Sequence, residues 1–359
     1  MTNKIKHILL FLAAIAATLL TTGCHKADIS PNSMYYWQAQ LTLTPNESQF
    51  LKDHNVKTVY LHLFDLEYAR KGRPVVTDLV KFKDKLPADV KVVPVISLDP
   101  YVVTDTTNVE WLARFIVDKA TEIMVNNGYP EPNELQIGYD WEERDQEAYF
   151  DMLRDIKSIL RKRDDGQLSV MVRLHQLSLE TPPVDYAVLM LDNTSRTRKT
   201  NARDAILNYE AIHEALDDLM RYPLPMATTL PLYGWDLIYK NDKFRISAYG
   251  LNLNDTSRYT QLSPGVYKSK IFRSVPLSIN PYNHAGHIYP GDIIYHFEPS
   301  AGMLDSVASM ISRVRPNDCS NVVLTRLDDP CIDRFHPHVY STLFKGGSAI
   351  GKDSVVVWD

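Results

Sequence analysis

The sequence is poor in glycine and has no excess of basic residues. It holds 14 glycines in 359 residues, and no GxGxxG or GxxxxGKS run occurs, so the usual glycine-rich phosphate-binding turns are absent. Lys and Arg number 39 against 44 Asp and Glu, a net charge of -5, whereas a dedicated nucleic-acid binder usually carries a basic excess. We therefore expect no nucleic-acid partner. A hydrophobic fraction of 45% excludes a disordered chain.

Cysteine is also scarce, and no CxxC or HExxH pattern accompanies the three that are present. We therefore predict neither a metal site nor a cofactor. Cys319 and Cys331 flank residues 322–324, which have the composition of a strand. A disulfide requires the two Cα atoms to lie within roughly 7 Å, and a straight strand between the cysteines works against this. A disulfide and two unpaired thiols both remain open.

The N-terminus has the pattern of an export signal. Lys4 and Lys6 precede an apolar run at 8–20, which has the length of a signal-peptide core and is too short to span a membrane. Small residues then lead to Cys24, as in bacterial lipoprotein signals, although a strict lipobox has Leu where Thr21 stands. We predict that residues 1–23 are a signal peptide and that Cys24 is lipidated; a plain secretory signal is the alternative.

Lipidation at Cys24 would anchor the protein to the cell membrane or outer membrane without spanning it. Removal of residues 1–23 takes away two lysines and no acid, so 37 basic residues remain against 44 acidic ones and the net charge becomes -7. A disulfide between the other two cysteines would be permitted in the exported compartment.

Strand-like and helix-like segments alternate through the rest of the chain. The strand-like runs lie at 34–39, 56–62, 90–96, 135–139, 168–174, 186–190, 225–230 and 322–327. Helical periodicity lies at 45–53, 109–125, 146–160 and 202–220, with no clear helix between the fifth and sixth strands. Eight β-α units predict an α/β fold, a single TIM (β/α)8 barrel over residues 24–359. A doubly wound open sheet is the alternative, and it would usually show a glycine-rich turn.

The segment 235–290 breaks the pattern because it is long, rich in tyrosine and rich in turns. Residues 245–249 and 265–272 have the character of short strands. We predict a β-rich insertion after the seventh strand that lies over the barrel mouth, where loops commonly shape substrate clefts.

Active sites of TIM barrels lie at the C-terminal ends of the strands. Asp140 and Glu142 follow the fourth strand two residues apart, so an extended strand would direct both carboxylates into the mouth. Two such acids can divide general-acid and supporting roles, as in glycoside hydrolysis. Alternatively, Asp140 pairs with Arg173, and Glu142 belongs to a solvated first helical turn. The other candidate sugar contacts at strand ends are Trp37, Trp141, Arg173, His175, Asp192, Tyr233 and Trp235.

The run at 139–142, Tyr-Asp-Trp-Glu, resembles the end of the strand-four signature Asp-Gly-x-Asp-x-Asp-Trp-Glu of glycoside hydrolase family 18. Residues 184–192 and 230–234 resemble that family's Met-x-Tyr-Asp and Pro-x-Tyr-Gly segments, in the same order. The resemblance implies a TIM barrel acting on N-acetylhexosamine glycans, with Glu142 as general acid and Asp140 orienting the acetamide. The sequence departs from the family at Leu135 and Gly138, where the signature has Asp, and at Leu191, where it has Tyr.

Residues 173–177, 182–185, 189–191 and 230–235 are also similar to uncharacterised lipoproteins of gut-type bacteria, a TIM-barrel group related to glycosidases. That group often has Thr or another polar residue where Glu142 stands. Three hypotheses follow: a glycosidase, a non-catalytic glycan-binding lipoprotein on a degenerate glycosidase barrel, and an assembly lipoprotein whose mouth is plugged by the insertion.

Overall fold

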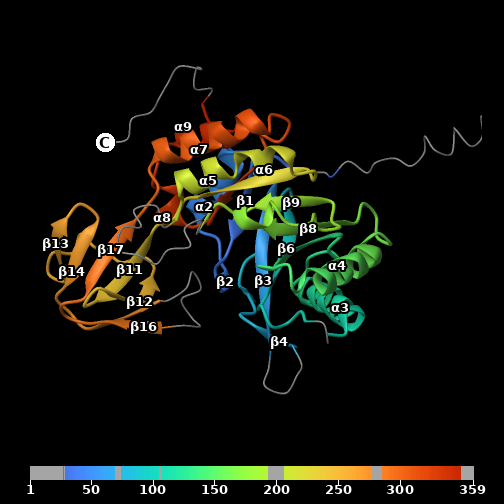
Figure 1. Ribbon diagram of the computed structural model, residues 1–359, viewed down its shortest axis with the longest axis horizontal. Helices are drawn as coiled ribbons and strands as arrows, with labels where there is room; N and C mark the ends of the chain where they lie inside the picture. Colours follow the sequence, from blue (N-terminus) through green and yellow to red (C-terminus); the bar gives the residue numbers. More distant parts are fainter. Residues whose placement is uncertain are drawn as a thin grey trace, which may run out of the picture.

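Eight parallel strands close into a barrel (Figure 1). The computed structural model describes residues 27, 29–68, 74–104, 107–192, 206–276 and 285–348. The barrel strands are β1 (Ser33–Tyr36), β3 (Thr58–Tyr68), β6 (Lys91–Leu98), β7 (Glu134–Gly138), β8 (Gln167–Val172), β9 (Tyr186–Leu189), β10 (Met226–Pro231) and β18 (Val322–Thr325). β1 pairs with β3 on one side and with β18 on the other, which closes the ring and confirms the predicted TIM barrel.

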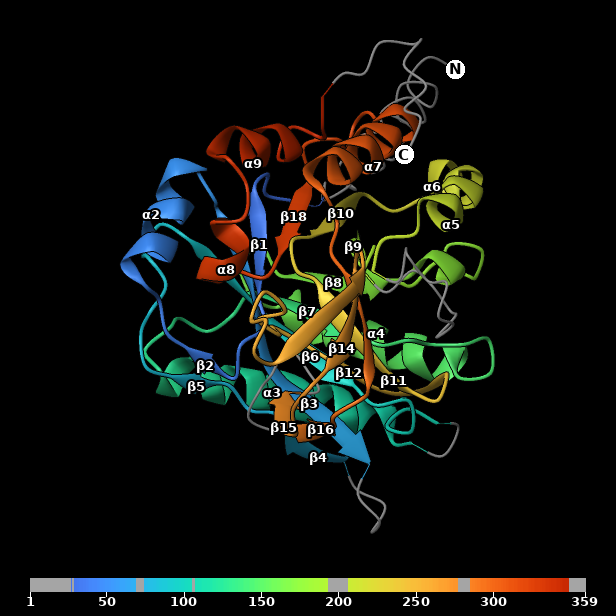
Figure 2. The ribbon, with the colours of Figure 1, turned by 90° about the vertical axis from the view of Figure 1, so that its left-hand side faces the viewer.

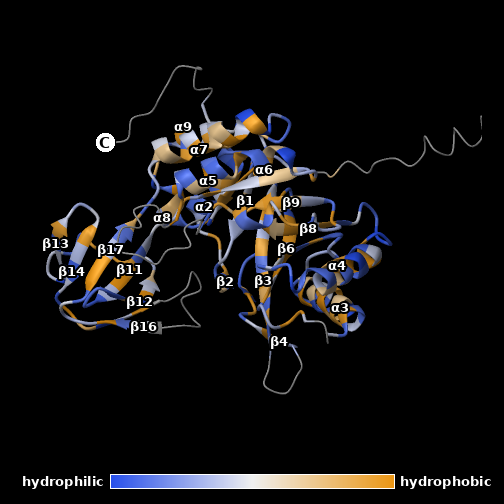
Figure 3. Cartoon of the chain, viewed as in Figure 1, coloured by the Kyte–Doolittle hydropathy of each residue, from blue (hydrophilic) through white to orange (hydrophobic). Residues whose placement is uncertain are grey.

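Helices cover the outside of the barrel. They include α2 (Pro45–Asp53), α3 (Val109–Asn126) and α4 (Gln146–Leu160), close to the predicted ranges. Thr44 caps α2 through a capping box with Glu47, and Pro45 takes the first helical position, where its missing N–H costs nothing. In Figure 3 the barrel strands are largely hydrophobic, whereas α3 and α4 carry hydrophilic residues as well. The main hydrophobic core lies between the strands and these helices.

The helices of the C-terminal half differ from those predicted. Instead of one long helix over 202–220, the described part holds two short helices, α5 (Tyr209–Glu214) and α6 (Leu216–Arg221). They are separated at Ala215, which ends the first and begins the second; residues 202–205 lie outside the described residues. Only the 3-10 turn η1 (Leu174–Gln176) follows β8. The helices α7 (Ala301–Val314), α8 (Asp329–Ile332) and α9 (Pro337–Leu343) were not predicted from the sequence.

The insertion after β10 forms an antiparallel sheet in the order β12-β11-β17-β14-β13. Its strands are β11 (Trp235–Lys240), β12 (Lys243–Ala248), β13 (Tyr259–Ser263), β14 (Val266–Ser269) and β17 (Ile293–Phe297). A separate ribbon pairs β15 (Arg273–Pro276) with β16 (Ala285–Ile288). The sheet continues through β17 and so extends past the predicted limit at 290. β4 (Pro74–Thr77) pairs with the C-terminal part of β3, and β2 (Gln40–Leu41) pairs with β5 (Lys81–Phe82).

The inserted sheet lies beside the barrel (Figures 1 and 2). In both views β16 lies at the same end of the molecule as β4, which is the end where β3 finishes and therefore the mouth of the barrel. The opposite end is where the chain enters β1. There Ala27 and Ile29 pack against the hydrophobic cluster inside the barrel, so the segment before β1 covers its N-terminal end.

The barrel interior also contains a hydrogen-bonded polar group. Glu134 is 2% exposed; its carboxylate lies 2.5 Å from Lys91 Nζ and accepts a hydrogen bond from the hydroxyl of Tyr186. The Tyr186 and Tyr60 hydroxyls are 2.8 Å apart. Buried polar groups are stable only when they are paired in this way. The interior is therefore filled by side chains and is not an open channel.

A chain of charged side chains joins the inserted sheet to the barrel. His296 Nδ1 lies 2.8 Å from Asp236 Oδ1, and its Nε2 lies 3.8 Å from Glu298 Oε2. Arg334 Nε lies 3.1 Å from Glu298 Oε1, and the same guanidinium donates to the Leu232 carbonyl at the end of β10. Burial lowers the pKa of His296, but the two carboxylates outweigh it and raise this pKa to about 9.

This pKa shift predicts a loss of stability at alkaline pH. The folded-state pKa of His296 lies above its unfolded value of roughly 6.5, so its contribution is complete below that pH and is lost as the pH rises through about 9. We expect the thermal unfolding midpoint to fall between pH 6.5 and 9, and to fall less in His296→Gln. The matched control, His338→Gln at an exposed position, should keep the wild-type slope; equal slopes in all three proteins would contradict the assignment.

Candidate functional site

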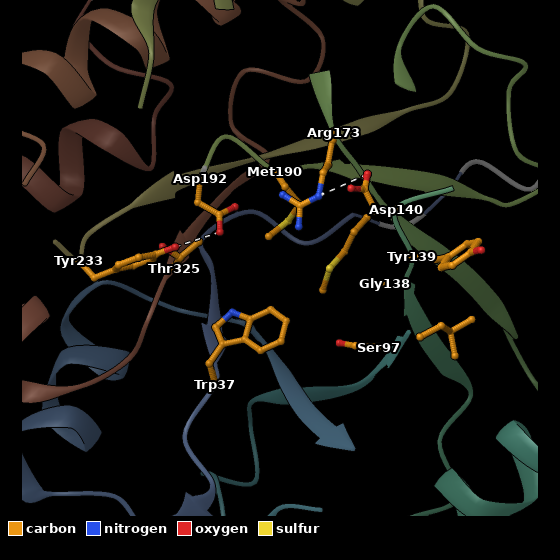
Figure 4. A pocket seen from close by; sticks show the side chains of 12 residues that line it. Trp37, Ser97, Gly138, Tyr139, Asp140, Arg173, Met190, Asp192, Tyr233 and Thr325 are labelled. Atoms are coloured by element: carbon orange, nitrogen blue, oxygen red, sulfur yellow. Dashed lines mark hydrogen bonds and ion pairs between the residues drawn. The ribbon is translucent and has the colours of Figure 1, made fainter. Parts of the chain in front are cut away.

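A cavity of about 270 Å³ opens at the C-terminal ends of the barrel strands (Figure 4). Its lining residues come from or just after seven of the eight strands: Trp37, Ser97, Leu98, Gly138, Tyr139, Asp140, Met171, Arg173, Met190, Asp192, Tyr233 and Thr325. No side chain of the inserted sheet is among these lining residues. In the part of the chain that the structure describes, the insertion therefore flanks the mouth without plugging it.

Trp37 is the only tryptophan among the described residues that line the cavity. It follows β1, and its ring stacks on Tyr35 with centroids 5.3 Å apart. Its ring centroid also lies 5.1 Å from that of His62, whose Nε2 is 2.6 Å from Asp65 Oδ1. Contacts on two sides fix the indole while leaving it partly exposed to the cavity. A fixed aromatic face of this kind suits a ligand with an apolar face.

Asp192 and Tyr233 form a polar pair on one side of Trp37 (Figure 4). The Tyr233 hydroxyl donates to Asp192 Oδ2 at 2.9 Å. Burial, and then the charge of Asp192, raise the pKa of Tyr233 well above its ordinary value, so its hydroxyl stays protonated at neutral pH. Asp192 Oδ1 is buried and has no hydrogen-bond partner among the described residues. A ligand hydroxyl or amide N–H would satisfy it.

Asp140 lies on the other side of the cavity with two basic partners. Its Oδ1 is 3.2 Å from His175 Nε2 and 3.7 Å from Arg173 Nε. The ends of β7 and β8 are neighbours, which brings these side chains together. The sequence left this pairing of Asp140 with Arg173 open as the alternative to a catalytic role for Asp140. The Asp140 side chain is still 53% exposed, so a ligand can reach it.

Gly138 explains one departure from the family signature. A Cβ atom added at this position would lie 2.9 Å from the Met171 sulfur, closer than real Cβ contacts allow. The space of the missing Asp side chain is thus occupied by Met171 from the next strand. Met171 and Met190 were not predicted as lining residues. Each stands two positions before a predicted polar residue, Arg173 and Asp192, so the two-residue period of a strand could have identified them.

Glu142 lies outside the cavity. β7 ends at Gly138, and the following loop turns back on Asp145, which accepts the backbone N–H of Glu142 at 2.7 Å and the Tyr139 hydroxyl at 2.7 Å. The Glu142 side chain is 62% exposed, and its Oε2 lies 3.3 Å from Arg144 Nε. Because the strand period stops at Gly138, only Asp140 of the two carboxylates lines the cavity.

Two of the predicted sugar-stacking tryptophans are buried in packing. Trp141 is fully buried, and its ring stacks on Tyr149 of α4 with centroids 5.3 Å apart. Trp235 begins β11 and belongs to a hydrophobic cluster with Leu237 and Phe297. Neither lines the cavity, so in this structure Trp37 and Tyr233 are the candidate aromatics that do.

Cys319 and Cys331 are both free thiols. They stand on either side of β18, and the extended strand between them carries the chain from one end of the barrel to the other. The possible disulfide is therefore not formed. Burial raises the pKa of the Cys331 thiol well above its ordinary value, so it stays protonated. Cys24, the predicted lipidation site, lies outside the described residues.

The described residues include no group of three His, Cys, Asp or Glu side chains placed to hold a metal ion. Among the same residues, no helix has both the length and the apolar character needed to cross a bilayer.

Comparison with known proteins finds similarity in fold. No protein-family model matches the sequence, and no curated protein matches it. The C-terminal domain of putative chitinase from Desulfitobacterium hafniense DCB-2 has a TM-score of 0.50 and 11% identity, over 88% of this chain and 100% of that one. The Ostrinia furnacalis Group IV chitinase in complex with allosamidin has a TM-score of 0.49 and 10% identity, over 88% of this chain and 99% of that one. The spore cortex-lytic enzyme SleL of Bacillus megaterium QM B1551 has a TM-score of 0.48 and 10% identity, over 89% of this chain and 75% of that one.

At these identities the likeness shows the fold alone. The chain has a TIM barrel like that of the Desulfitobacterium domain.

Proposed function

We propose that this protein is an exported, lipid-anchored glycan-binding protein that holds a sugar at the barrel mouth without cleaving it. One observation carries the proposal: Trp37, Asp140, Asp192 and Tyr233 surround a single cavity, while the Glu142 side chain lies outside it. Export and the anchor at Cys24 rest on the N-terminal sequence.

The cavity chemistry supports a sugar ligand. A sugar ring has apolar faces and a polar edge, and the site offers an aromatic face at Trp37 with carboxylate acceptors at Asp140 and Asp192. Its volume of about 270 Å³ is close to the lower limit of small-ligand pockets, roughly 300 Å³. We therefore expect it to hold a short segment of a glycan, with the rest of the chain extending over the surface.

The position of Glu142 favours binding over cleavage. A general acid must lie within hydrogen-bond reach of the bond that it protonates, and the loop contacts at Asp145 direct the Glu142 segment away from the cavity. Hydrolysis is the second candidate function. It is favoured by the exposure of the Glu142 carboxylate and its place two residues beyond Asp140, because apo geometry can tighten when substrate binds.

A glycan screen with the soluble form that starts after Cys24 separates the two functions. We expect wild type and Glu142→Gln to bind the same glycan with the same affinity and to release no product. Affinity is measured by titration calorimetry, and product by chromatography of the reducing ends. Cleavage by wild type that falls roughly 10²–10⁴-fold in Glu142→Gln would instead establish a glycosidase with Glu142 as its acid. Glu143→Gln is the matched control for removal of a neighbouring charge.

A further inference from the structure

The ribbon of β15 and β16 has an inner and an outer face. Val275 and Ile288 point into the hydrophobic core of the insertion and are 1% and 0% exposed. Ser274 stands opposite His287 in the register. Phe272 lies two residues before Ser274 and Tyr289 two residues after His287, so both share the outer face with His287. Phe272 is 60% exposed, and the other two rings are exposed as well.

These three rings form a cluster in which two are stacked and Tyr289 is tilted, and two basic groups lie over the Tyr289 ring. The Phe272 and His287 rings are nearly parallel, at 11°, with centroids 5.3 Å apart, and the Tyr289 ring lies 5.2 Å from Phe272. Lys240 Nζ and Arg245 Cζ lie 5.6 Å and 4.8 Å from the centre of the Tyr289 ring. We call these five residues the aromatic–basic patch.

A buried carboxylate holds part of the patch in place. Asp292 is fully buried, and its Oδ2 accepts the Tyr289 backbone N–H at 2.9 Å and the Arg245 Nη1 at 2.6 Å. Side chains that are ordered before a ligand arrives lose less entropy when it binds. The Tyr289 backbone and the Arg245 guanidinium are therefore ordered before a ligand arrives.

We propose that the aromatic–basic patch is a second glycan-binding site, on which a sugar ring lies against the exposed Phe272 ring, which is backed by the stacked His287 ring. Lys240 and Arg245 donate hydrogen bonds to its hydroxyl or carboxylate groups. An exposed ring near a guanidinium that Asp292 holds in place matches the apolar face and polar edge of a sugar. The ligand class rests on the proposed function of the barrel mouth.

Position favours a glycan over a membrane as the ligand. The ribbon lies at the mouth end of the molecule (Figure 2), where a glycan too long for the cavity would emerge. Aromatic and basic residues also suit a lipid surface, but the chain enters the barrel from the opposite end, at Ala27 and Ile29. A glycan that reaches both sites binds with avidity, and two linked contacts raise the overall affinity on the order of 100-fold above that of one contact.

The test compares short and long chains of each glycan on an immobilised array, using the soluble form that starts after Cys24. We expect the double variant Phe272→Ala, Tyr289→Ala to bind long chains on the order of 100-fold more weakly than wild type and short chains equally well. Phe272→Trp should retain long-chain binding because it keeps a ring. Leu262→Ala, which removes another exposed apolar side chain of the insertion, should match wild type.

This experiment distinguishes an error in the proposal for the patch from an error in the proposal for the cavity. Long-chain binding that survives the double variant but is lost in Trp37→Ala overturns the patch and leaves the cavity standing. The reverse result overturns the cavity and leaves the patch. Absence of any bound glycan overturns both. Sedimentation with vesicles containing phosphatidylglycerol that is lost in the double variant, without any loss of glycan binding, also overturns the proposal and assigns the patch to lipid.

Discussion

Trp37→Ala is expected to weaken binding of a short glycan about 30-fold, a loss of about 2 kcal/mol. Trp37 supplies the main aromatic face of the cavity, and its indole is fixed by contacts with Tyr35 and His62. Truncation to alanine removes both the apolar contact with the sugar and the fixed aromatic ring of the site. Titration calorimetry measures the change directly and does not depend on tryptophan fluorescence.

The matched control for this prediction is Trp111→Ala. Trp111 is 44% exposed on α3, stacks on Phe115, and does not line the cavity. It should leave the affinity unchanged. Equal affinities of Trp37→Ala and wild type would remove the cavity as the sugar site, and Trp37→Phe should restore part of the loss if stacking is the cause.

Lys91→Met is expected to lower the free energy of unfolding by about 3 kcal/mol. The substitution leaves the Glu134 carboxylate, which is 2% exposed, inside the barrel without its cation. Urea unfolding at pH 7 measures the change. Because the deficit arises from the unpaired charge, the further substitution Glu134→Leu should recover most of the stability.

Lys57→Met tests whether burial is the cause. Lys57 Nζ lies 4.0 Å from Asp89 Oδ2, and both side chains are largely exposed. Exposed pairs contribute roughly 0–1 kcal/mol, so this variant should stay close to wild type. A loss in Lys91→Met no larger than in Lys57→Met would show that the interior charge pair contributes little to stability.

The barrel could be predicted from the sequence because its strands are short apolar runs buried on both faces. The run at 90–96 is nearly continuous in hydrophobicity and became β6. The two short helices α5 and α6 could not be separated in advance, because the break at Ala215 lies within a helix-forming run. Local propensity does not record where packing against the barrel ends a helix.

The candidate site was predicted less completely, and the loop after β7 shows why. Strand periodicity extended to Glu142 would direct it into the mouth, but Asp145 captures its backbone N–H and Trp141 turns into the core beside Tyr149. These contacts are formed by residues that follow the motif. Asp140 follows the end of β7 and still reaches the cavity, where it lies beside Arg173 and His175 after the neighbouring strand β8.

The packing of Ala27 and Ile29 against the barrel interior has a consequence for the lipid anchor proposed at Cys24. Residue 27 is three positions after Cys24, and three extended residues span at most about 11 Å. With a lipid on Cys24, such a short linker would hold the N-terminal end of the barrel against the bilayer. The barrel axis would then point away from the bilayer, with the cavity a full barrel length above the lipid and open to polymers approaching from outside.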